Sequence, residues 1–306
     1  MPWRRAMAGR WLVNINRVGL ILLVTIIVGI PCSAGEPLKP VWTVKECVGA
    51  PSHGLYDPDS RTLFVSQISG EGDKKDGVGV VSQLDLNGNM LDCKWISGLD
   101  APKGIARQGK TLWVSDIDRL HRIDIATGEV AECLEVPGAK FLTGVAVDSQ
   151  GTVYVADMLE STIFQYRDEK FTVFAAGDAL ESPAGLIVEK DRLVIAAWGL
   201  TTDYTTKVPG RFIALEHGKP RGLSKPLGNL YGLVSDGAGG YIGTDFASGR
   251  VLHRKDKGEP RELLQLPKGV GGIEYVPSKR LLIVLEITEN RISAYDLSAV
   301  LKSVSR

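Results

Sequence analysis

The stretch Leu142–Asp157, LTGVAVDSQGTVYVAD, decides the fold of this chain. Two runs in which apolar residues alternate, GVAVD and TVYVAD, flank the polar turn SQG. Alternation with a period of two on both sides of a short Ser/Gly turn predicts a β-hairpin with one buried face. One isolated hairpin is at best marginally stable in water, so other parts of the chain must pack against it.

Variants of this hairpin pattern occur six times along the chain. The copies begin at Ser52, Lys103, Thr143, Ala184, Tyr231 and Gly271, which lie 51, 40, 41, 47 and 40 residues apart. Repeats of this length, built from short alternating strands, are typical of a β-propeller with one four-stranded antiparallel sheet, or blade, per repeat. We therefore predict an all-β fold, a six-bladed β-propeller. Its longer loops are expected at Ser69–Gly79 and Gly199–Gly210.

The two ends of the repeat region predict how the ring closes. Residues 41–48, VWTVKECV, precede the first repeat and have no hairpin of their own. After the last repeat only residues 298–306, SAVLKSVSR, remain, and they predict a weak strand at most. An open propeller would leave two sheet edges unpaired. We therefore expect residues 41–48 to supply the outer strand of the sixth blade.

Residues 1–34 have the composition of a signal peptide rather than of the propeller. Four arginines, Arg4, Arg5, Arg10 and Arg17, precede a 13-residue apolar run that ends at Ile30, and small residues follow. This order predicts a secretory signal cleaved after Ala34, since the run is short for a transmembrane helix. An uncleaved membrane anchor and a lipid-modified Cys32 are the alternatives. We expect one propeller domain at 35–306, periplasmic or secreted, with no stable membrane insertion after cleavage.

Charge and cysteine content limit the classes of partner. The whole chain has 36 basic and 36 acidic residues, and removing the four arginines leaves 32 basic residues against 36 acidic ones. Without a basic patch or run, nucleic acid is not expected as a partner.

Cys47, Cys93 and Cys133 could form one disulfide and a free thiol, or could be buried at equivalent places in successive repeats. The oligomeric state is expected to be monomeric.

A functional site in a propeller is expected where the innermost strands enter the central channel. The first ring consists of the residues that open the six copies. A second ring lies at the ends of the second strands: Gln67, Asp116, Asp157, Trp198, Asp245 and Glu286. An Asp after a strand often caps the next turn, so Asp116, Asp157 and Asp245 have a structural interpretation beside the functional one, and the same holds for Glu286. The mature histidines, His53, His121, His217 and His253, are too scattered to predict a triad.

The repeats and several phrases resemble the gluconolactonase, senescence marker protein and luciferin-regenerating enzyme family, closest to its exported bacterial members. The phrases are YDPDSRTLFVSQ (56–67), LDAPKGIA (99–106), KFLTGVAVD (140–148) and DGAGGYIGTD (236–245), and the likeness extends over about residues 40–298. The resemblance implies a six-bladed propeller with a divalent metal, often calcium, in its channel. It also implies hydrolysis of lactones or related esters, with the metal acting as a Lewis acid.

The positions that the resemblance assigns to the metal are substituted in this chain. Ser52 stands where the family has a Glu ligand, Ala184 where it has an Asn ligand, and Tyr231 where it has an Asp ligand. Thr143 replaces a further Asn nearby. Hard divalent cations need several oxygen ligands, preferably carboxylates. We therefore expect no metal at the family site and no cofactor, with calcium only if the site has moved.

These observations favour a propeller that binds a small anionic or sugar-like ligand at the channel mouth, without the family's metal-dependent hydrolysis. The residues expected there are Ser52, His53, Lys103, Thr143, Trp198 and Tyr231. One alternative is a lactone or ester hydrolase with no metal, using a base such as His53, or with a relocated metal held by second-ring acids. Another is an interaction platform for an envelope protein. Whether the chain is an enzyme stays open at this point.

Overall fold

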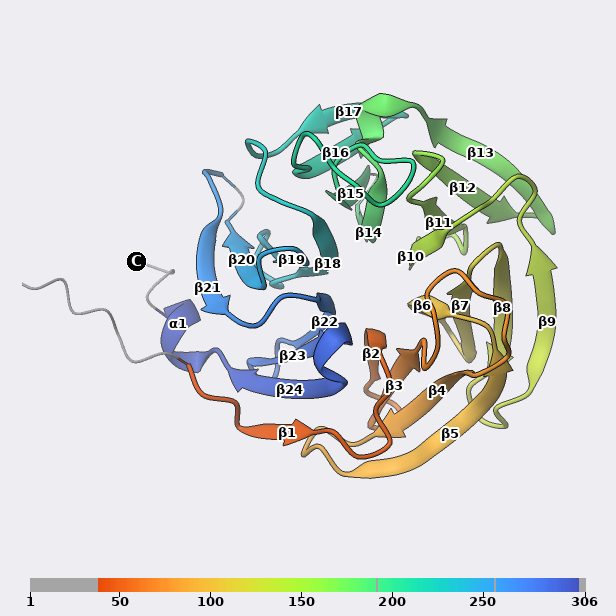
Figure 1. Cartoon of the computed structure of the whole chain (residues 1–306), viewed down its shortest axis with the longest axis vertical. Coiled ribbons are helices and arrows are strands. Elements are labelled where there is room, and N and C mark those ends of the chain that lie inside the picture. The colour runs from red at the N-terminus through yellow and green to blue at the C-terminus, as the bar shows by residue number, and fades with distance from the viewer. Residues whose placement is uncertain (1–37, 191, 256, 303–306) are drawn as a thin grey trace, which may run out of the picture. The chain divides into compact units, whose positions relative to one another are not determined.

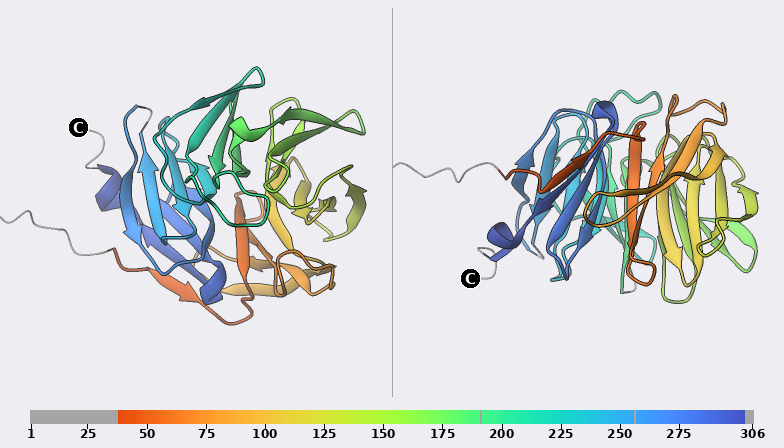
Figure 2. Two further views of the ribbon diagram at one scale, coloured as in Figure 1. Left: turned by 45° about the horizontal axis from the view of Figure 1, so that its top comes forward. Right: turned by 90° about the horizontal axis from the view of Figure 1, so that it is seen from below.

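The computed structural model describes residues 38–190, 192–255 and 257–302. These residues belong to one compact unit that begins at Pro37, whereas the predicted signal peptide at 1–34 lies outside the described residues. The described strands form six four-stranded antiparallel sheets, as predicted. Figure 1 shows these sheets as the blades of a ring, and Figure 2 shows them from two further directions.

Each blade uses consecutive strands, from the innermost to the outermost, except the sixth. Blade 1 contains β2 (Pro51–Asp57), β3 (Thr62–Gln67), β4 (Gly79–Leu84) and β5 (Met90–Leu99). Blade 2 contains β6 (Pro102–Gln108), β7 (Thr111–Asp116), β8 (Arg119–Asp124) and β9 (Val130–Glu135). Blade 3 contains β10 (Leu142–Val147), β11 (Val153–Asp157), β12 (Thr162–Arg167) and β13 (Lys170–Ala176).

The second half of the ring repeats this order. Blade 4 contains β14 (Pro183–Glu189), β15 (Arg192–Ala197), β16 (Phe212–Glu216) and β17 (Lys219–Gly222). Blade 5 contains β18 (Leu230–Ser235), β19 (Tyr241–Asp245), β20 (Arg250–Arg254) and β21 (Arg261–Gln265). Blade 6 contains β22 (Val270–Val276), β23 (Leu281–Glu286), β24 (Arg291–Asp296) and β1 (Trp42–Val44). Short 3₁₀ turns cover Asp178–Leu180 and Ile287–Glu289.

Side chains packed between neighbouring blades hold the ring together. The innermost strands β2, β6, β10, β14, β18 and β22 each contact the innermost strands of both adjacent blades. A cluster of buried apolar residues fills each of the six blade junctions. In the junction between blades 1 and 2, for example, Phe64 and Val81 pack with Ile105 and Val114. The alternation seen in the sequence thus places apolar side chains on faces that the next blade covers.

Strand β1 closes the ring, in agreement with the sequence. It pairs antiparallel with β24 in the register Trp42 to Ala294 and Val44 to Ile292, although it is shorter than the predicted 41–48. The prediction of a weak strand after residue 297 is wrong, because Ser298–Lys302 form the short helix α1. The edge of β24 is already occupied by β1, and the Asp296 carboxylate accepts the N–H of Ser298 (2.7 Å) in a turn just before the helix, whose first α-helical backbone bond runs from the N–H of Leu301 to the carbonyl oxygen of Leu297 (2.9 Å).

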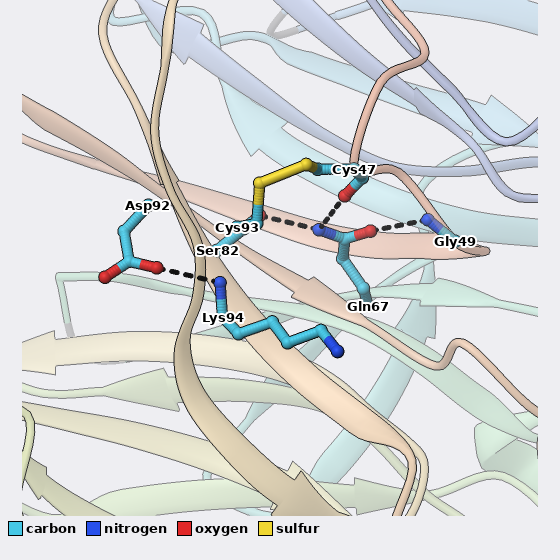
Figure 3. Close-up of a disulfide and its surroundings, with 7 residues drawn as sticks. All are labelled: Cys47, Gly49, Gln67, Ser82, Asp92, Cys93 and Lys94. Carbon is cyan, nitrogen blue, oxygen red and sulfur yellow. Dashed lines mark hydrogen bonds between the residues drawn. A yellow bond between two sulfur atoms is a disulfide. The ribbon is translucent and has the colours of Figure 1, made fainter.

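A disulfide joins Cys47, just after β1, to Cys93 on the outermost strand of blade 1, with 5.5 Å between their Cα atoms. Beside it, the Gln67 amide bonds the carbonyl of Cys47 (3.1 Å) and the N–H of Gly49 (2.6 Å), as Figure 3 shows. Cys133 is exposed and free. The alternative of buried cysteines at equivalent places in successive repeats is therefore wrong, since Cys47 and Cys93 are bonded to each other and Cys133 is exposed. Among the described residues, no helix has the length and apolar character needed to cross a membrane.

Candidate ligand site at the channel mouth

All six first-ring residues lie at β-bulges near the start of the innermost strands. The pairing of each innermost strand with its neighbour shifts register at this point: between residues 51 and 53, 102 and 105, 142 and 145, 183 and 185, 230 and 233, and 270 and 273. A bulge redirects the side chain of the extra residue and is common next to functional sites. Because of these register shifts, the side chains of the first-ring residues need not follow the regular alternation of the strand.

The residue after the first-ring position is glycine in blades 2 to 6 and histidine in blade 1. The glycines are Gly104, Gly144, Gly185, Gly232 and Gly272. A Cβ on Gly104 would lie 2.1 Å from the carbonyl oxygen of Thr143 in the next blade, so the close approach of adjacent strands excludes a side chain there. A Cβ on Gly272 would lie 2.9 Å from Cγ of His53. Gly272 therefore leaves the space in which the His53 ring packs.

A cavity of about 390 Å³ lies at the mouth, and its walls are mainly apolar and aromatic. Of the six predicted mouth residues, Lys103, Trp198 and Tyr231 line it. Two loops contribute to its walls through Gly70 and Gly72 on one side and Tyr204 on the other. These are the long loops expected from the sequence at 69–79 and 199–210. The remaining lining residues are Ala50, Ile68, Phe141, Met158, Phe246 and Ile287.

Lys103 places a buried amine at this cavity. Its side chain is 1% exposed, and Nζ donates hydrogen bonds to the carbonyl oxygens of Gly72 (2.7 Å) and Ala101 (2.9 Å). Nζ also lies 4.2 Å from the centre of the Phe141 ring, within the range of a cation–π interaction. Burial lowers the pKa of Lys103 to about 8, although the more distant charges of Asp116 and Asp73 act against this shift. Among the described residues, no carboxylate oxygen lies within the 4.0 Å of an ion pair.

Ser52, His53 and Tyr231 form a hydrogen-bonded group across the channel. The hydroxyl of Ser52 lies 3.0 Å from the Tyr231 hydroxyl and 3.1 Å from Nδ1 of His53. Burial raises the pKa of Tyr231 to about 12, and burial together with the charge of Lys103 lowers the pKa of His53 to about 3. At neutral pH all three groups are therefore uncharged. Nε2 of His53 is buried and lacks a hydrogen-bond partner in the described part of the protein.

This group lies between the mouth cavity and a second cavity inside the channel. Tyr231 lines the mouth cavity, whereas His53 lines the second one, whose volume is about 260 Å³. The innermost strands surround the second cavity with apolar residues, and Glu274 contributes a carboxyl group. Burial raises the pKa of Glu274 to about 8, a shift that the backbone N–H of Tyr56 partly offsets. The channel thus has two compartments with different linings.

Three of the predicted mouth residues do not line the mouth cavity: His53, which lines the second cavity, and Thr143 and Ser52. Thr143 is fully buried, and its hydroxyl lies within hydrogen-bond distance of two carbonyl oxygens, those of Pro183 in blade 4 (3.3 Å) and Ala156 in blade 3 (3.4 Å), to either of which its one O–H can donate. Ser52 is also fully buried and does not line the mouth cavity. Trp198 stacks near Phe246, with 5.3 Å between ring centres, and its Nε1 is buried without a hydrogen-bond partner among the described residues.

The second ring is engaged in hydrogen bonds within the blades. Four of its members accept N–H groups from the loop that enters the innermost strand of the same blade. These pairs are Gln67 with Gly49 (2.6 Å), Asp116 with Ala101 (2.6 Å), Asp157 with Lys140 (2.6 Å) and Asp245 with Asn229 (3.0 Å). Glu286 instead accepts from Nε of Arg291 (2.7 Å) and from Ser293 (2.8 Å). The ring therefore holds the loops that shape the mouth.

Several residues that line the mouth cavity were not predicted from the sequence, although they occupy a regular position in the repeat. Ile68, Met158, Phe246 and Ile287 each come directly after a second-ring residue, at the point where the second strand has ended. Phe141 precedes the first-ring Thr143 by two positions. The residue after each second strand could therefore have been proposed from the repeat alignment alone, whereas Tyr204 carries no repeat signal.

The first-ring positions do not fit a divalent cation. Ser52 and Tyr231 offer two hydroxyls that already bond each other, Ala184 offers no oxygen from its side chain, and Lys103 adds a positive charge. Hard cations need several oxygen ligands with negative charge. Nowhere in the described ranges do three or more His, Cys, Asp or Glu side chains gather as a possible metal site.

Comparisons with known proteins bear on the fold. No protein-family model matches this chain, and no curated protein is significantly similar to it. Among solved structures, a catalytically inactive virginiamycin B lyase from Staphylococcus aureus with quinupristin has 12% identity and a TM-score of 0.58, and covers 85% of this chain and 99% of its own. A streptogramin B lyase has 12% identity and a TM-score of 0.60, with 84% and 96% covered. A nidogen/laminin complex has 20% identity and a TM-score of 0.54, with 66% and 74% covered. At these identities the likeness shows the propeller fold alone.

Proposed function

We propose that this chain is an exported β-propeller that binds a small, mainly apolar molecule with one anionic group in the mouth cavity. The observation that carries the proposal is Lys103. A fully buried ammonium group without a carboxylate partner is unusual in proteins, because its desolvation is costly. An anionic group of a ligand at Nζ would supply the missing countercharge.

The cavity walls support an apolar ligand over the sugar-like alternative. Trp198, Tyr231 and Phe246 present ring surface, and the polar side-chain groups among the lining residues are few: the Lys103 amine, the buried Trp198 N–H, and the hydroxyls of Tyr204 and Tyr231, of which that of Tyr231 is already bonded to Ser52. A sugar needs hydrogen-bond partners for several hydroxyl groups, whereas an apolar carboxylate needs donors at one end only. Glu71 and Asp73 line a shallower pocket that adjoins the mouth and would repel a multiply charged anion.

Export and the family assignment are parts of the same proposal. The Cys47–Cys93 disulfide supports an oxidising compartment, which accords with the signal peptide predicted from residues 1–34. Kinship with gluconolactonase-like propellers rests on the sequence resemblance and on the shared fold.

The binding test uses trans-cinnamate as an apolar carboxylate and cinnamyl alcohol as its uncharged counterpart. We expect the purified mature protein to bind cinnamate more tightly, measured by calorimetry or by quenching of tryptophan fluorescence. Lys103→Met should weaken cinnamate binding by about 10- to 100-fold, the value of one charged hydrogen bond, and leave the alcohol unaffected. Lys140→Met removes the charge of an exposed lysine that precedes the lining residue Phe141 in sequence, and it serves as the matched control. Equal affinity of wild type and Lys103→Met for cinnamate would contradict the proposal.

Hydrolysis without a metal is a second candidate, because Ser52 and His53 have the spacing of a nucleophile and its base. The enclosure of Ser52 opposes it, since a substrate in the mouth cavity would not reach its hydroxyl in this conformation. A panel of lactones and esters, assayed with and without chelator, tests this candidate and the relocated-metal alternative together. Turnover that Ser52→Ala abolishes would favour the dyad, and chelator-sensitive turnover would favour a metal.

A further inference from the structure

The nitrogen of Lys103 is held in a fixed position at an apolar cavity. Two carbonyl oxygens, from Gly72 and Ala101, accept its hydrogen bonds, and the ring of Phe141 lies beside it. These contacts occupy two of its three N–H groups, and Lys103 lines the cavity together with two of the residues that its nitrogen contacts, Gly72 and Phe141. Such fixation reduces the loss of side-chain freedom when the nitrogen reacts with a bound molecule.

The same surroundings keep part of the amine uncharged. Because burial lowers the pKa of Lys103 to about 8, on the order of a tenth of the molecules carry the free amine at pH 7, whereas an exposed lysine carries almost none. The free amine is the nucleophile of a lysine, and desolvation in an apolar pocket is one way in which proteins activate it. An exposed lysine such as Lys140, which pairs with Glu160, lacks both features.

We propose that Lys103 captures apolar aldehydes or ketones in the mouth cavity as a Schiff base, an inference that rests on the cavity being a ligand site as proposed above. The lone pair of the free amine attacks the carbonyl carbon, and the carbonyl π electrons move to oxygen. A proton passes from nitrogen to that oxygen, which gives a carbinolamine. Loss of water then forms the C=N bond, so that amine and carbonyl compound yield imine and water with no change of oxidation state.

The local geometry suits the product as well as the reactant. A protonated imine keeps one N–H, which can still donate to the carbonyl oxygen of Gly72 or Ala101. The cavity wall offers the ring surface of Trp198, Tyr231 and Phe246 to the organic part of the adduct. Apolar walls also exclude water, which slows hydrolysis of the imine. Aromatic and other apolar carbonyl compounds are therefore the expected class.

The test uses trans-cinnamaldehyde with sodium cyanoborohydride, which reduces an imine to a stable secondary amine. We expect wild-type protein at pH 7 to gain one lysine adduct, distinct from any addition to the exposed thiol of Cys133, and peptide mapping should show that it forms on Lys103 at least tenfold faster than on any exposed lysine. Unfolding the protein in urea should remove this preference. Lys103→Arg should lose the rapid adduct and Lys140→Arg should keep it. Labelling of native wild type spread evenly over exposed lysines, without excess at Lys103, would overturn the inference whether or not Lys103→Arg folds.

Comparison with cinnamate separates this inference from the proposed function. Cinnamate that binds, together with cinnamaldehyde that fails to label Lys103, overturns the Schiff base and leaves the binding function intact. Rapid labelling of Lys103 without measurable cinnamate binding supports the Schiff base and overturns the anionic ligand. If cinnamate does not bind and cinnamaldehyde does not label Lys103, the proposed ligand and the Schiff base are both overturned. If cinnamate binds and cinnamaldehyde also labels Lys103, cinnamate should protect Lys103 from labelling in proportion to its occupancy of the cavity.

Discussion

The hydroxyl oxygen of Tyr231 lies 3.0 Å from that of Ser52, across the channel between blades 5 and 1. The sequence resemblance assigns an Asp and a Glu ligand to these two positions. Two carboxylates at such a distance would repel each other without a cation between them. Two hydroxyls bond directly, so this pair stabilises the centre of the ring without an ion.

Affinity for an anionic ligand should depend on pH through Lys103. Because burial lowers its pKa to about 8, the amine is mainly charged below that pH and mainly neutral above it. We expect cinnamate affinity to be nearly constant up to about pH 7 and to fall as the pH rises through 8. Cinnamyl alcohol titrated in parallel should show no such change. Cinnamate affinity that stays constant up to pH 10 would contradict the role of Lys103.

Asp157 should be a major contributor to stability. Its carboxylate accepts four backbone N–H groups, those of Lys140 (2.6 Å), Phe141 (3.3 Å), Leu159 (3.0 Å) and Glu160 (3.0 Å). Asp157→Asn places an amide NH₂ against two of these donors. We expect a loss of about 2–4 kcal/mol in the free energy of unfolding, measured with urea.

The exposed Asp168 provides the control for this substitution, since its side chain is 92% exposed. Asp168→Asn should change the free energy of unfolding by less than about 0.5 kcal/mol. A similar effect of both substitutions would show that the hydrogen bonds of Asp157 do not stabilise the mouth.

The close approach of blades 2 and 3 predicts a large cost for Gly104→Ala. The new Cβ would lie 2.1 Å from the carbonyl oxygen of Thr143 and 2.7 Å from the N of Val145, so the strands would have to separate. We expect a loss of more than about 2 kcal/mol in the free energy of unfolding. Gly54, on β2, has its nearest contact at 3.5 Å, so Gly54→Ala should cost less than about 1 kcal/mol. Thermal and urea unfolding measure the loss of stability in Gly104→Ala and Gly54→Ala. Equal losses in the two variants would refute the steric argument.

Loss of the disulfide should lower stability without changing the fold. Cys93→Ser removes the disulfide, which joins residues with a sequence separation of 46. We expect the free energy of unfolding to fall by about 2–4 kcal/mol. Cys133→Ser alters an exposed free thiol and should have little effect. Unfolding in urea measures both variants. If dithiothreitol lowers the stability of wild type but not of Cys93→Ser, the effect belongs to this bond.

The repeat made the fold predictable, because each hairpin carries its own alternation and the repeat length limits the architecture. Residues 41–48 could be placed in the sixth blade because a closed ring needs an outer strand there. The helix at Ser298–Lys302 could not be foreseen from composition, since it depends on β1 occupying the edge of β24.

The site was less predictable than the fold, because the alternation of apolar residues along a strand does not reveal where a β-bulge redirects a side chain. Lys103 and Tyr231 line the mouth cavity, yet Thr143 and Ser52, which occupy equivalent first-ring positions in the repeat, are fully buried and do not line it. Which first-ring side chains reach a cavity depends on the loops above them. Tyr204 illustrates this, since it reaches the wall from an irregular loop.

The Cys47–Cys93 bond has a consequence for the order of assembly. Strand β1 is the first of the described strands to be made, yet its partner β24 is the last of them, so blade 6 is completed late. A covalent link from the end of β1 to blade 1 keeps the early strand beside the place where the late one must arrive. The ring is thereby closed by two independent links, the backbone hydrogen bonds of β1 with β24 and the covalent bond from the end of β1 to blade 1.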